Sequence, residues 1–377
     1  MAYYILNSYK LKINPLRVFE ALKNEKNCFF LDSSLNSNYS LGRYSFLGID
    51  PFYILETKNQ DPFNKLREIL EKYKISAPRN SLPFLGGCVG YLAYDLGFLL
   101  EKRLQKITKD DLGIPDCLFG FYNTVITIDN FKKILYISAV GFPEKSYRLS
   151  KSLCELNFKK IYKLLTQAKF CKINHKENKP KDKQLKLKSN FTREDYLLAV
   201  TKAKRYIKEG DIYQVNLSQR FESSTNLSAF QIYKRLRKLS PSYFSAYQDF
   251  GGFQILSSSP ERFLRLEANT VSTRPMKGTR PRFKIMQKDL RLKKELLESE
   301  KDAAELIMIV DLERNDLGRV CKYDSIKVDR LRDLEEYNTV FQTTATVSGK
   351  LHADKDRIDL LRACFPGGSI TGCPKIR

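Results

Sequence analysis

A lysine-rich segment near the middle of the chain most limits how this sequence can fold. Residues 169–190, KFCKINHKENKPKDKQLKLKSN, contain eight lysines and a proline and show no sustained apolar period. Such a segment buries too little apolar surface to join a core, and its like charges repel one another. We therefore predict an exposed connector between two halves, residues 1–168 and residues 191–377. A solvated edge strand is the alternative for its LKLK end.

The segments on either side of the connector mix strand and helix patterns without strict alternation. Two strand-like runs, Phe121–Ile128 and Ile134–Val140, flank a turn at Asp129-Asn130 and predict a hairpin. Further strand patterns occupy residues 211–222, 254–259, 262–267 and 340–349. Helical periods occupy residues 62–73, 193–209 (after the N-cap candidate Thr192), 229–239, 289–298 and 301–312. This order predicts an α+β fold rather than a doubly wound sheet.

The composition of the chain limits which kinds of partner it is expected to bind and in which cellular compartment it is expected to lie. The net charge is +23, but no nucleic-acid-binding motif accompanies it, so we expect no nucleic-acid partner. The most apolar window, residues 83–100, is interrupted by Asp95 and several glycines, so we expect no membrane partner either. A basic surface can still attract a polyanionic small molecule. The eight cysteines form no CxxC pair and there are only two histidines, which disfavours a zinc site. The first residues contain no apolar signal region, so we expect a cytoplasmic protein with reduced thiols.

Two carboxylates lie three residues apart in a predicted helix. Asp302 and Glu305 therefore share one helix face. One interpretation is a solvated acidic edge. The other is a site for Mg²⁺, which prefers carboxylate oxygens and keeps several waters.

Glu261 follows Ser-Ser-Ser-Pro and is flanked by apolar strand residues. Partial burial there would raise the pKa of its carboxyl and make it a candidate general acid. The alternative is a salt bridge to Arg262 or Arg265.

Two further stretches contain groups that could bind or react. Gly367–Gly372, GGSITG, exposes backbone N–H groups and the hydroxyls of Ser369 and Thr371, a possible cradle for a carboxylate or phosphate. Lys277, in PMKGTR, becomes a nucleophile if it is desolvated or placed near another cation. In so lysine-rich a chain, the alternative is an ordinary surface lysine.

Five motifs occur in one order: GDIYQVNLSQRF, SSSPERFL, PMKGTRPR, ELIMIVDLERNDLGRV and FPGGSITGCPKIR. In this order they resemble the chorismate-utilising enzymes, from about the connector to the last residue. That family includes anthranilate synthase large subunits, isochorismate and salicylate synthases, and aminodeoxychorismate synthase component I. The resemblance implies an α+β sandwich with large antiparallel sheets, of the anthranilate synthase component I type.

The resemblance also implies roles for individual residues. Glu305 matches a direct ligand of the Mg²⁺ that holds the ring carboxylate of chorismate, and Asp302 matches a position that reaches the metal through water. Glu261 matches the general acid for the C4 hydroxyl. Gln214 lies where isochorismate and salicylate synthases carry a water-activating lysine, which argues against those activities. The remaining substrate-binding positions implied are Thr279, Gln342, Gly368, Ser369, Thr371 and Gly372.

Lys277 lies where anthranilate synthases usually carry alanine. A lysine there is typical of aminodeoxychorismate synthases, in which it attacks C2 of chorismate, ammonia then adds at C4, and the lysine is expelled. Ammonia would come from a separate glutamine amidotransferase subunit, and the product would serve p-aminobenzoate and folate synthesis. The alternatives are an anthranilate synthase large subunit with an unusual lysine, and a non-catalytic remnant that binds only a ligand or partner.

The resemblance implies a second pocket, for tryptophan, in the amino-terminal half. Its residues would be Ser33, Arg43, Tyr44, Tyr243, Phe244 and Ser245. The usual Asn-Pro-Ser-Pro-Tyr run is here SPSYF, and an aromatic packing contact between the halves is the alternative.

Two departures from the family pattern affect the expected activity. Gln342 and Ala345 stand where much of the family has a histidine and a serine. The chain also stops at PKIR, whereas relatives continue with a further Mg²⁺ glutamate and with the Tyr and Arg that hold the enolpyruvyl carboxylate. We expect either a fragment of a longer polypeptide or a truncated product with very weak activity.

Overall fold

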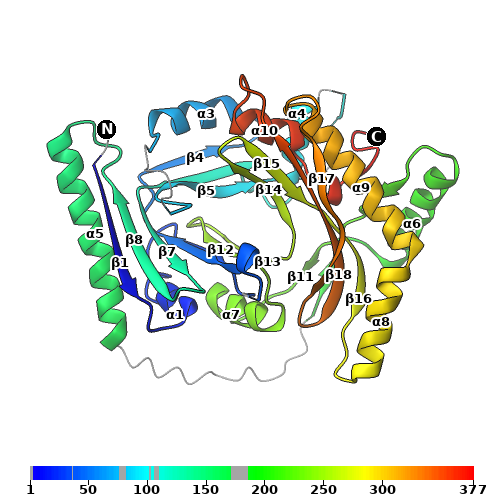
Figure 1. Ribbon diagram of the computed structural model, residues 1–377, viewed down its shortest axis with the longest axis horizontal. Helices are drawn as coiled ribbons and strands as arrows, with labels where there is room; N and C mark the ends of the chain where they lie inside the picture. Colours follow the sequence, from blue (N-terminus) through cyan, green and yellow to red (C-terminus); the bar gives the residue numbers. More distant parts are fainter. Residues whose placement is uncertain (1–2, 36, 76–81, 102, 106–109, 171–185) are drawn as a thin grey trace. The chain divides into compact units, whose positions relative to one another are not determined.

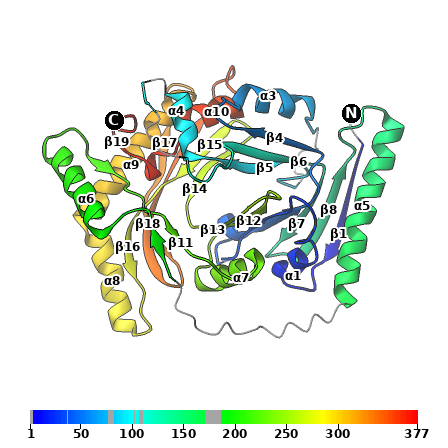
Figure 2. The ribbon, with the colours of Figure 1, turned by 180° about the vertical axis from the view of Figure 1, so that it is seen from behind.

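The computed structural model describes residues 3–170 and 186–377, except 36, 76–81, 102 and 106–109 (Figures 1 and 2). These residues form two units. The first is built from the described parts of Met1–Leu100, Gln105–His175 and Ser228–Pro260. The second is built from the described parts of Glu101–Leu104, Lys176–Leu227 and Glu261–Arg377. The second unit contains every residue predicted to act in catalysis, metal binding or substrate binding.

The first unit is organised around a seven-stranded antiparallel sheet in the order β1-β8-β7-β3-β2-β12-β13. Its strands are β1 (Tyr4–Lys10), β2 (Phe29–Asp32), β3 (Tyr44–Gly48), β7 (Thr124–Asp129), β8 (Ile134–Val140), β12 (Phe244–Asp249) and β13 (Gln254–Ser259). A three-stranded antiparallel sheet has the order β4-β6-β5, with β4 (Tyr53–Thr57), β5 (Gly87–Leu92) and β6 (Cys117–Tyr122). Helices of this unit are α1 (Pro15–Glu20), α2 (Tyr39–Gly42), α3 (Phe63–Lys72), α4 (Gly97–Leu100), α5 (Tyr147–Phe170) and α7 (Ala229–Leu239), with the 3₁₀ turn η1 (Tyr94–Leu96).

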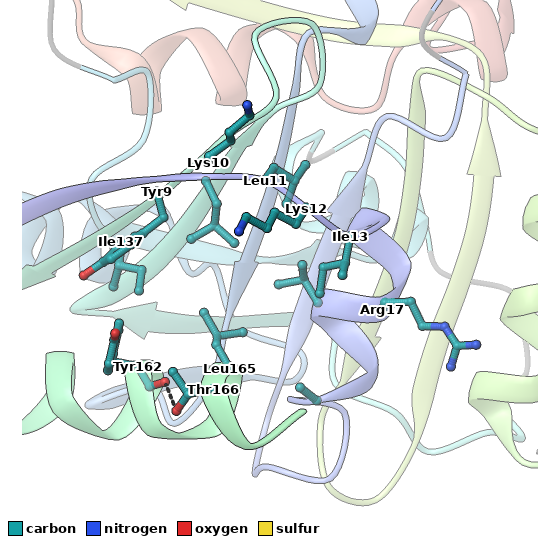
Figure 3. A pocket seen from close by; sticks show the side chains of 13 residues that line it. Tyr9, Lys10, Leu11, Lys12, Ile13, Arg17, Ile137, Tyr162, Leu165 and Thr166 are labelled. Atoms are coloured by element: carbon teal, nitrogen blue, oxygen red, sulfur yellow. Dashed lines mark hydrogen bonds between the residues drawn. The ribbon is translucent and has the colours of Figure 1, made fainter. Parts of the chain in front are cut away.

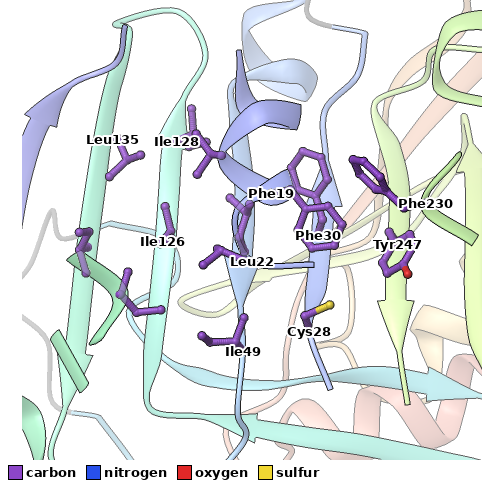
Figure 4. Close-up of a cluster of buried hydrophobic side chains, with 14 of the residues drawn as sticks. Phe19, Leu22, Cys28, Phe30, Ile49, Ile126, Ile128, Leu135, Phe230 and Tyr247 are labelled. Carbon is purple, nitrogen blue, oxygen red and sulfur yellow. The ribbon is translucent and has the colours of Figure 1, made fainter. Parts of the chain in front are cut away.

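Both faces of the seven-stranded sheet are covered, and β7 is buried at every residue. On one face, side chains of α1, α5 and α7 pack with alternate strand residues, among them Phe19, Phe30 and Ile126 (Figure 4). On the other face, Phe29 and Val125 pack with Val89 and Tyr122 of the three-stranded sheet. Successive strand residues point to opposite faces, so neighbours such as Phe29 and Phe30 enter different clusters.

The second unit contains a five-stranded antiparallel sheet, in which β14, β15, β18 and β16 follow one another and β17 also pairs with β18. Its strands are β14 (Arg262–Glu267), β15 (Thr270–Arg274), β16 (Met276–Pro281), β17 (Lys327–Glu336) and β18 (Val340–Lys350). Two short pairs are β10 (Gln214–Val215) with β19 (Gly372–Cys373), and β11 (Phe221–Glu222) with β9 (Lys188–Ser189). The helices are α6 (Arg193–Lys208), α8 (Met286–Glu298), α9 (Glu300–Gly318) and α10 (Arg357–Cys364), with the 3₁₀ turn η2 (Gly368–Ile370). Both α8 and α9 pack on β16 and β18, and α10 packs on α9.

The predicted α+β class with large antiparallel sheets is confirmed, as are the hairpin of β7 and β8 and the helices α3, α6 and α7. The N-cap prediction is also confirmed, since Thr192 Oγ1 accepts from the backbone N–H of Asp195 at 3.0 Å. Helix α9 extends to Gly318, beyond the predicted Leu312.

One predicted strand is wrong. Residues 211–222 were expected to form a single strand, but they form only the two-residue strands β10 and β11, which pair with different partners. A strand requires a partner along its whole length, and pairing here changes from Cys373 and Gly372 to Ser189 and Lys188.

The predicted connector is partly structured at both ends. Helix α5 continues to Phe170, and Lys188–Ser189 forms β9, as the edge-strand alternative anticipated. Residues 171–185 lie outside the described part of the chain. The compact units also differ from the predicted halves in two segments. Ser228–Pro260 belongs to the first unit, because β12 pairs with β2. The described part of Glu101–Leu104 belongs to the second unit.

Candidate active site

A bulge in β16 sets the position of Lys277. The pairing of β16 with β18 shifts register between Lys277 and Thr279, and Gly278 between them has φ +74°. Glycine adopts this left-handed conformation without strain, so the glycine of Lys-Gly-Thr permits the bulge at this position. The half-buried Lys277 donates from Nζ to the carbonyl oxygen of Ser369 at 3.0 Å. Its own carbonyl oxygen accepts from Thr343 Oγ1, which ties it to β18.

We expect Gly278→Ala to disturb this bulge. The added Cβ would lie 3.0 Å from Leu296 Cδ1 and 3.1 Å from Asp302 Cβ, in a backbone conformation that costs alanine about 1–2 kcal/mol. Urea unfolding should therefore show a loss of stability of at least that size. The matched control is Gly252→Ala, because a Cβ at Gly252 meets nothing within 4 Å. Equal stability of the two variants would contradict the role assigned to Gly278.

Glu261 lies at the junction of β13 and β14, beside Lys277. Burial raises the pKa of its carboxyl, and a hydrogen bond from Ser369 and the charge of Lys277 act in the opposite direction. The direction predicted from its sequence context is thus confirmed. The two arginines proposed as salt-bridge partners are engaged elsewhere: Arg262 donates to Ser272 at 3.0 Å, and Arg265 pairs with Glu267 at 2.5 Å.

The glycine-rich segment folds into the tight turn η2, which brings Ser369 to both Lys277 and Glu261. Ser369 and Thr371 are each only 7% exposed. The Thr371 hydroxyl donates to the carbonyls of Gly367 and Gly368, at 3.3 and 3.1 Å, so it stabilises the turn. The expectation that it supplies a free donor to a ligand is not supported, since short turns commonly use Ser and Thr hydroxyls in this way.

Glycine is required at two positions of this segment because other groups approach closely. A Cβ at Gly368 would lie 2.7 Å from Leu312 Cδ2, and one at Gly372 would lie 2.5 Å from the carbonyl oxygen of Gln214. Asn216, which is not among the predicted site residues, donates from Nδ2 to the carbonyls of Ser369 and Thr371, both at 3.2 Å. The signal that could have found Asn216 is its place in the GDIYQVNLSQRF motif, two residues after Gln214.

The two predicted metal ligands lie on α9 and have different partners. Glu305 Oε1 accepts from Gln214 Nε2 at 3.1 Å, and Gln214 Oε1 is buried without a hydrogen-bond partner. Asp302 is 9% exposed, and its Oδ2 lies 3.0 Å from Arg280 Nη2. No group of three or more His, Cys, Asp or Glu suited to a metal occurs within the described parts of the chain. Two carboxylates on one helix fit Mg²⁺ only if substrate and water provide the other oxygens.

Two of the predicted substrate-binding residues contact each other rather than the lysine. Gln342 Nε2 donates to Thr279 Oγ1 at 3.3 Å, across the paired strands β18 and β16. The structure therefore brings Lys277, Glu261 and Ser369 together, places Gln214 with Glu305, and keeps Thr279 with Gln342 as a separate pair.

The lysine, the half-buried glutamate and the glycine-rich turn lie in a chain that is similar to known proteins over most of its length. A family profile described as chorismate binding enzyme matches residues 26–377. The chain belongs to the chorismate-binding enzyme family. Family members are chorismate-utilising enzymes, so the family predicted from the five motifs is confirmed.

Relatives of this family member carry two different names. Anthranilate synthase component 1 of Acetivibrio thermocellus is 36% identical over 383 residues, which cover 96% of this chain and 77% of that protein. Aminodeoxychorismate synthase component 1 of Bacillus subtilis (strain 168) is 32% identical over 378 residues, which cover 96% of this chain and 78% of that protein. The crystal structure of anthranilate synthase component I from Streptococcus pneumoniae TIGR4 matches with a TM-score of 0.75 and 30% identity, covering 89% of this chain and 75% of that one. The anthranilate synthase component I type of fold is thereby confirmed.

The residues predicted for a tryptophan pocket all lie in the first unit, and their polar groups bond to that unit. Ser33 Oγ donates to the Tyr44 carbonyl at 2.7 Å, and Arg43 Nε pairs with Asp129 at 2.9 Å. The Tyr243 hydroxyl hydrogen-bonds to Ser37 Oγ at 2.9 Å. Phe244 and Ser245 follow on β12, where Ser245 Oγ hydrogen-bonds to Ser34 and Ser242. Tryptophan binding by this family member stays a prediction.

A small cavity of the first unit contains none of the predicted site residues. It is lined by side chains of β1, α1, β8 and α5, including Tyr9, Leu11, Ile137 and Leu165 (Figure 3). Its volume of about 50 Å³ has room for a few water molecules, which is too little for a ring-sized substrate.

Among the helices that the structure describes, none is long and apolar enough to cross a membrane.

Proposed function

We propose that this family member is an aminodeoxychorismate synthase component I, which converts chorismate and ammonia to 4-amino-4-deoxychorismate. The observation that carries the proposal is the convergence on one residue: Lys277 Nζ donates to the Ser369 carbonyl, and the Ser369 side chain hydrogen-bonds to Glu261. A nucleophile and a candidate acid held by the same turn can act on one substrate ring from fixed positions.

The proposed reaction uses Lys277 as a nucleophile and Glu261 as a general acid. The Lys277 amine loses a proton and forms a bond to C2 of chorismate, while the ring double bond shifts and the C4–O bond breaks. Glu261 supplies the proton with which the C4 hydroxyl departs as water; its raised pKa keeps that proton available. Ammonia then bonds to C4 and gives up a proton, the double bond shifts back, and Lys277 leaves C2 and takes up a proton to become a free amine again. The proton that Lys277 released in the first step restores Glu261. Chorismate and ammonia thus give aminodeoxychorismate and water.

We also propose that Mg²⁺ assists this reaction, with Glu305 as a ligand and Asp302 nearby. When bound, Mg²⁺ would neutralise and polarise the ring carboxylate of chorismate. Gln214 donates to Glu305 and so holds that carboxylate in place. Arg280 pairs with Asp302 and balances its charge. We further propose a glutamine amidotransferase subunit as the source of ammonia, and a cytoplasmic location.

Anthranilate synthase is the second candidate, because relatives of that name match as much of the chain and reach 36% identity. In that reaction ammonia would add at C2, where the proposed lysine bond would block it. A non-catalytic remnant that binds tryptophan or an amidotransferase partner, without turning over chorismate, is the third candidate.

The product distinguishes these candidates. We expect purified full-length protein, incubated with chorismate, Mg²⁺ and ammonium, to form aminodeoxychorismate, detected by chromatography and mass spectrometry. Anthranilate as the product would overturn the proposal. If neither product forms, calorimetry with chorismate decides the remaining question: Mg²⁺-dependent binding excludes the remnant, and no binding supports it.

A further inference from the structure

A buried carboxyl that the proposed reaction does not use lies directly behind the glycine-rich turn. Glu313, on α9, is only 2% exposed. Its Oε2 accepts from Thr273 Oγ1 of β15 at 3.3 Å. A Cβ built on Gly368 would lie 3.2 Å from Glu313 Oε1, so the carboxyl and the turn backbone are in close contact. A larger side chain at position 313 would therefore press on the turn.

The next residue of that turn is the one that contacts both proposed reactive groups. The Ser369 carbonyl accepts from Lys277, and the Ser369 side chain hydrogen-bonds to Glu261. Glu313 and the reactive pair thus lie against adjacent residues of a short, buried turn. A buried carboxyl is costly to keep unless it has a compensating role, and packing alone would be served better by an apolar side chain.

We propose that Glu313 is a positioning residue for the proposed active site: it supports the Gly368–Ser369 turn from behind and, by its charge, controls how firmly Glu261 holds its proton. The expected effect of Glu313 on catalysis rests on the proposed function. The contact between Glu313 and the turn is independent of the substrate.

The charged groups around Glu313 explain why its charge can vary near neutral pH. On α9, Asp316 pairs with Lys375 Nζ at 2.6 Å, and Lys375 also donates to the Cys364 carbonyl of α10. Burial and then Asp316 raise the pKa of Glu313 to about 7, Lys375 and the Thr273 hydrogen bond lower it, and Glu261 raises it slightly. The Cys364 thiol also faces this group, and burial keeps it protonated by raising its pKa.

The repulsion between Glu313 and Glu261 acts on both carboxyls. When Glu313 is ionised, Glu261 therefore retains its proton more strongly, which favours its role as an acid. Removal of the Glu313 charge should lower the pKa of Glu261.

The test is Glu313→Gln, which keeps the shape and the acceptor for Thr273 but removes the charge. We expect the alkaline limb of the pH profile of kcat/KM to move to lower pH by roughly half a unit, the order of effect of one like charge in a partly screened site. Glu313→Asp keeps the charge and should leave that limb closer to its original position. The matched control is Asp311→Asn on the same helix, whose side chain is 78% exposed; it should produce no shift.

A second measurement does not depend on turnover. Infrared difference spectra of the full chain, without substrate, should show a protonated-carboxyl band that titrates around pH 7 and disappears in Glu313→Gln. The band that Glu261→Gln removes should titrate at lower pH in Glu313→Gln than in the parent protein. If Glu261 titrates at lower pH in Glu313→Gln but the parent protein forms no aminodeoxychorismate, the proposed function is refuted and this inference is supported. An unchanged Glu261 titration would overturn the inference, even if the variant lost stability.

Discussion

Replacement of Lys277 by alanine is expected to abolish the covalent adduct between the protein and chorismate. Intact-protein mass spectrometry after incubation with chorismate and Mg²⁺ should show the adduct in the parent protein and none in the variant. Aminodeoxychorismate formation should fall by about 10²-fold or more, the usual effect of removing one catalytic group. The reason is positional: the bulge at Gly278 and the bond to Ser369 hold Nζ next to Glu261.

The control for Lys277→Ala is Lys284→Ala. Lys284 lies seven residues further along the chain, between β16 and α8, and is exposed. Its removal changes the net charge equally and should leave both adduct and product unchanged. An adduct that persists in Lys277→Ala would remove this lysine from the mechanism. Anthranilate formation by Lys277→Ala would show that the same site can direct ammonia to C2 once the lysine is gone.

Among the single variants proposed for this protein, Arg237→Ala is expected to lower the free energy of unfolding most. Asp32, on β2, has a side chain that is fully buried, and Arg237 of α7 donates to its two oxygens at 2.5 and 3.4 Å. Tyr233 contributes a third hydrogen bond to Asp32 at 3.2 Å. Loss of the guanidinium leaves a buried carboxylate without its charge partner, which commonly costs about 3–5 kcal/mol. Urea unfolding followed by circular dichroism measures this loss.

The pH dependence of that loss has a definite sign. Burial raises the pKa of Asp32, and Arg237 lowers it. Without Arg237 the pKa rises further, so the folded protein binds a proton that the unfolded chain releases above its ordinary pKa. Stability of the variant should therefore fall as the pH increases above the ordinary pKa of an aspartate and through the raised pKa of Asp32.

Two further variants test this explanation. Lys238→Ala, at the exposed next position, should stay within about 0.5 kcal/mol of the parent protein. Asp32→Asn combined with Arg237→Ala should recover part of the stability, since no buried charge remains. A double variant as unstable as Arg237→Ala would show that lost packing, rather than the unpaired charge, explains the effect.

Local sequence signals predicted much of the secondary structure. Helix α6 begins after the Thr192 cap, and α7 spans the residues given by its 3.6-residue period. The cap and the helical period each involve residues within a few positions of one another, so these helices can be predicted directly from the sequence. The strand predicted over residues 211–222 failed because strand pairing depends on distant segments, here residues near 188 and 372.

The candidate site residues were also chosen from the sequence, through motifs whose order is specific. Lys277, Glu261 and Glu305 each lie in one of these motifs. Their neighbours could not be deduced in the same way. Asn216 supports the turn, and Glu313 packs behind it, because β10 and α9 approach residues 367–372 only in the folded chain.

By itself, the sequence determined the family, the α+β class and the candidate nucleophile, because the family and the lysine follow from the order of the motifs and the class follows from the hydrophobic periods. Only the tertiary structure decided which groups meet. It joined Lys277 and Glu261 through Ser369, used the Thr371 hydroxyl within the turn, and paired Asp302 with Arg280. The physical reason is that hydrogen bonds and pKa shifts depend on distances of a few ångströms between residues far apart in the chain.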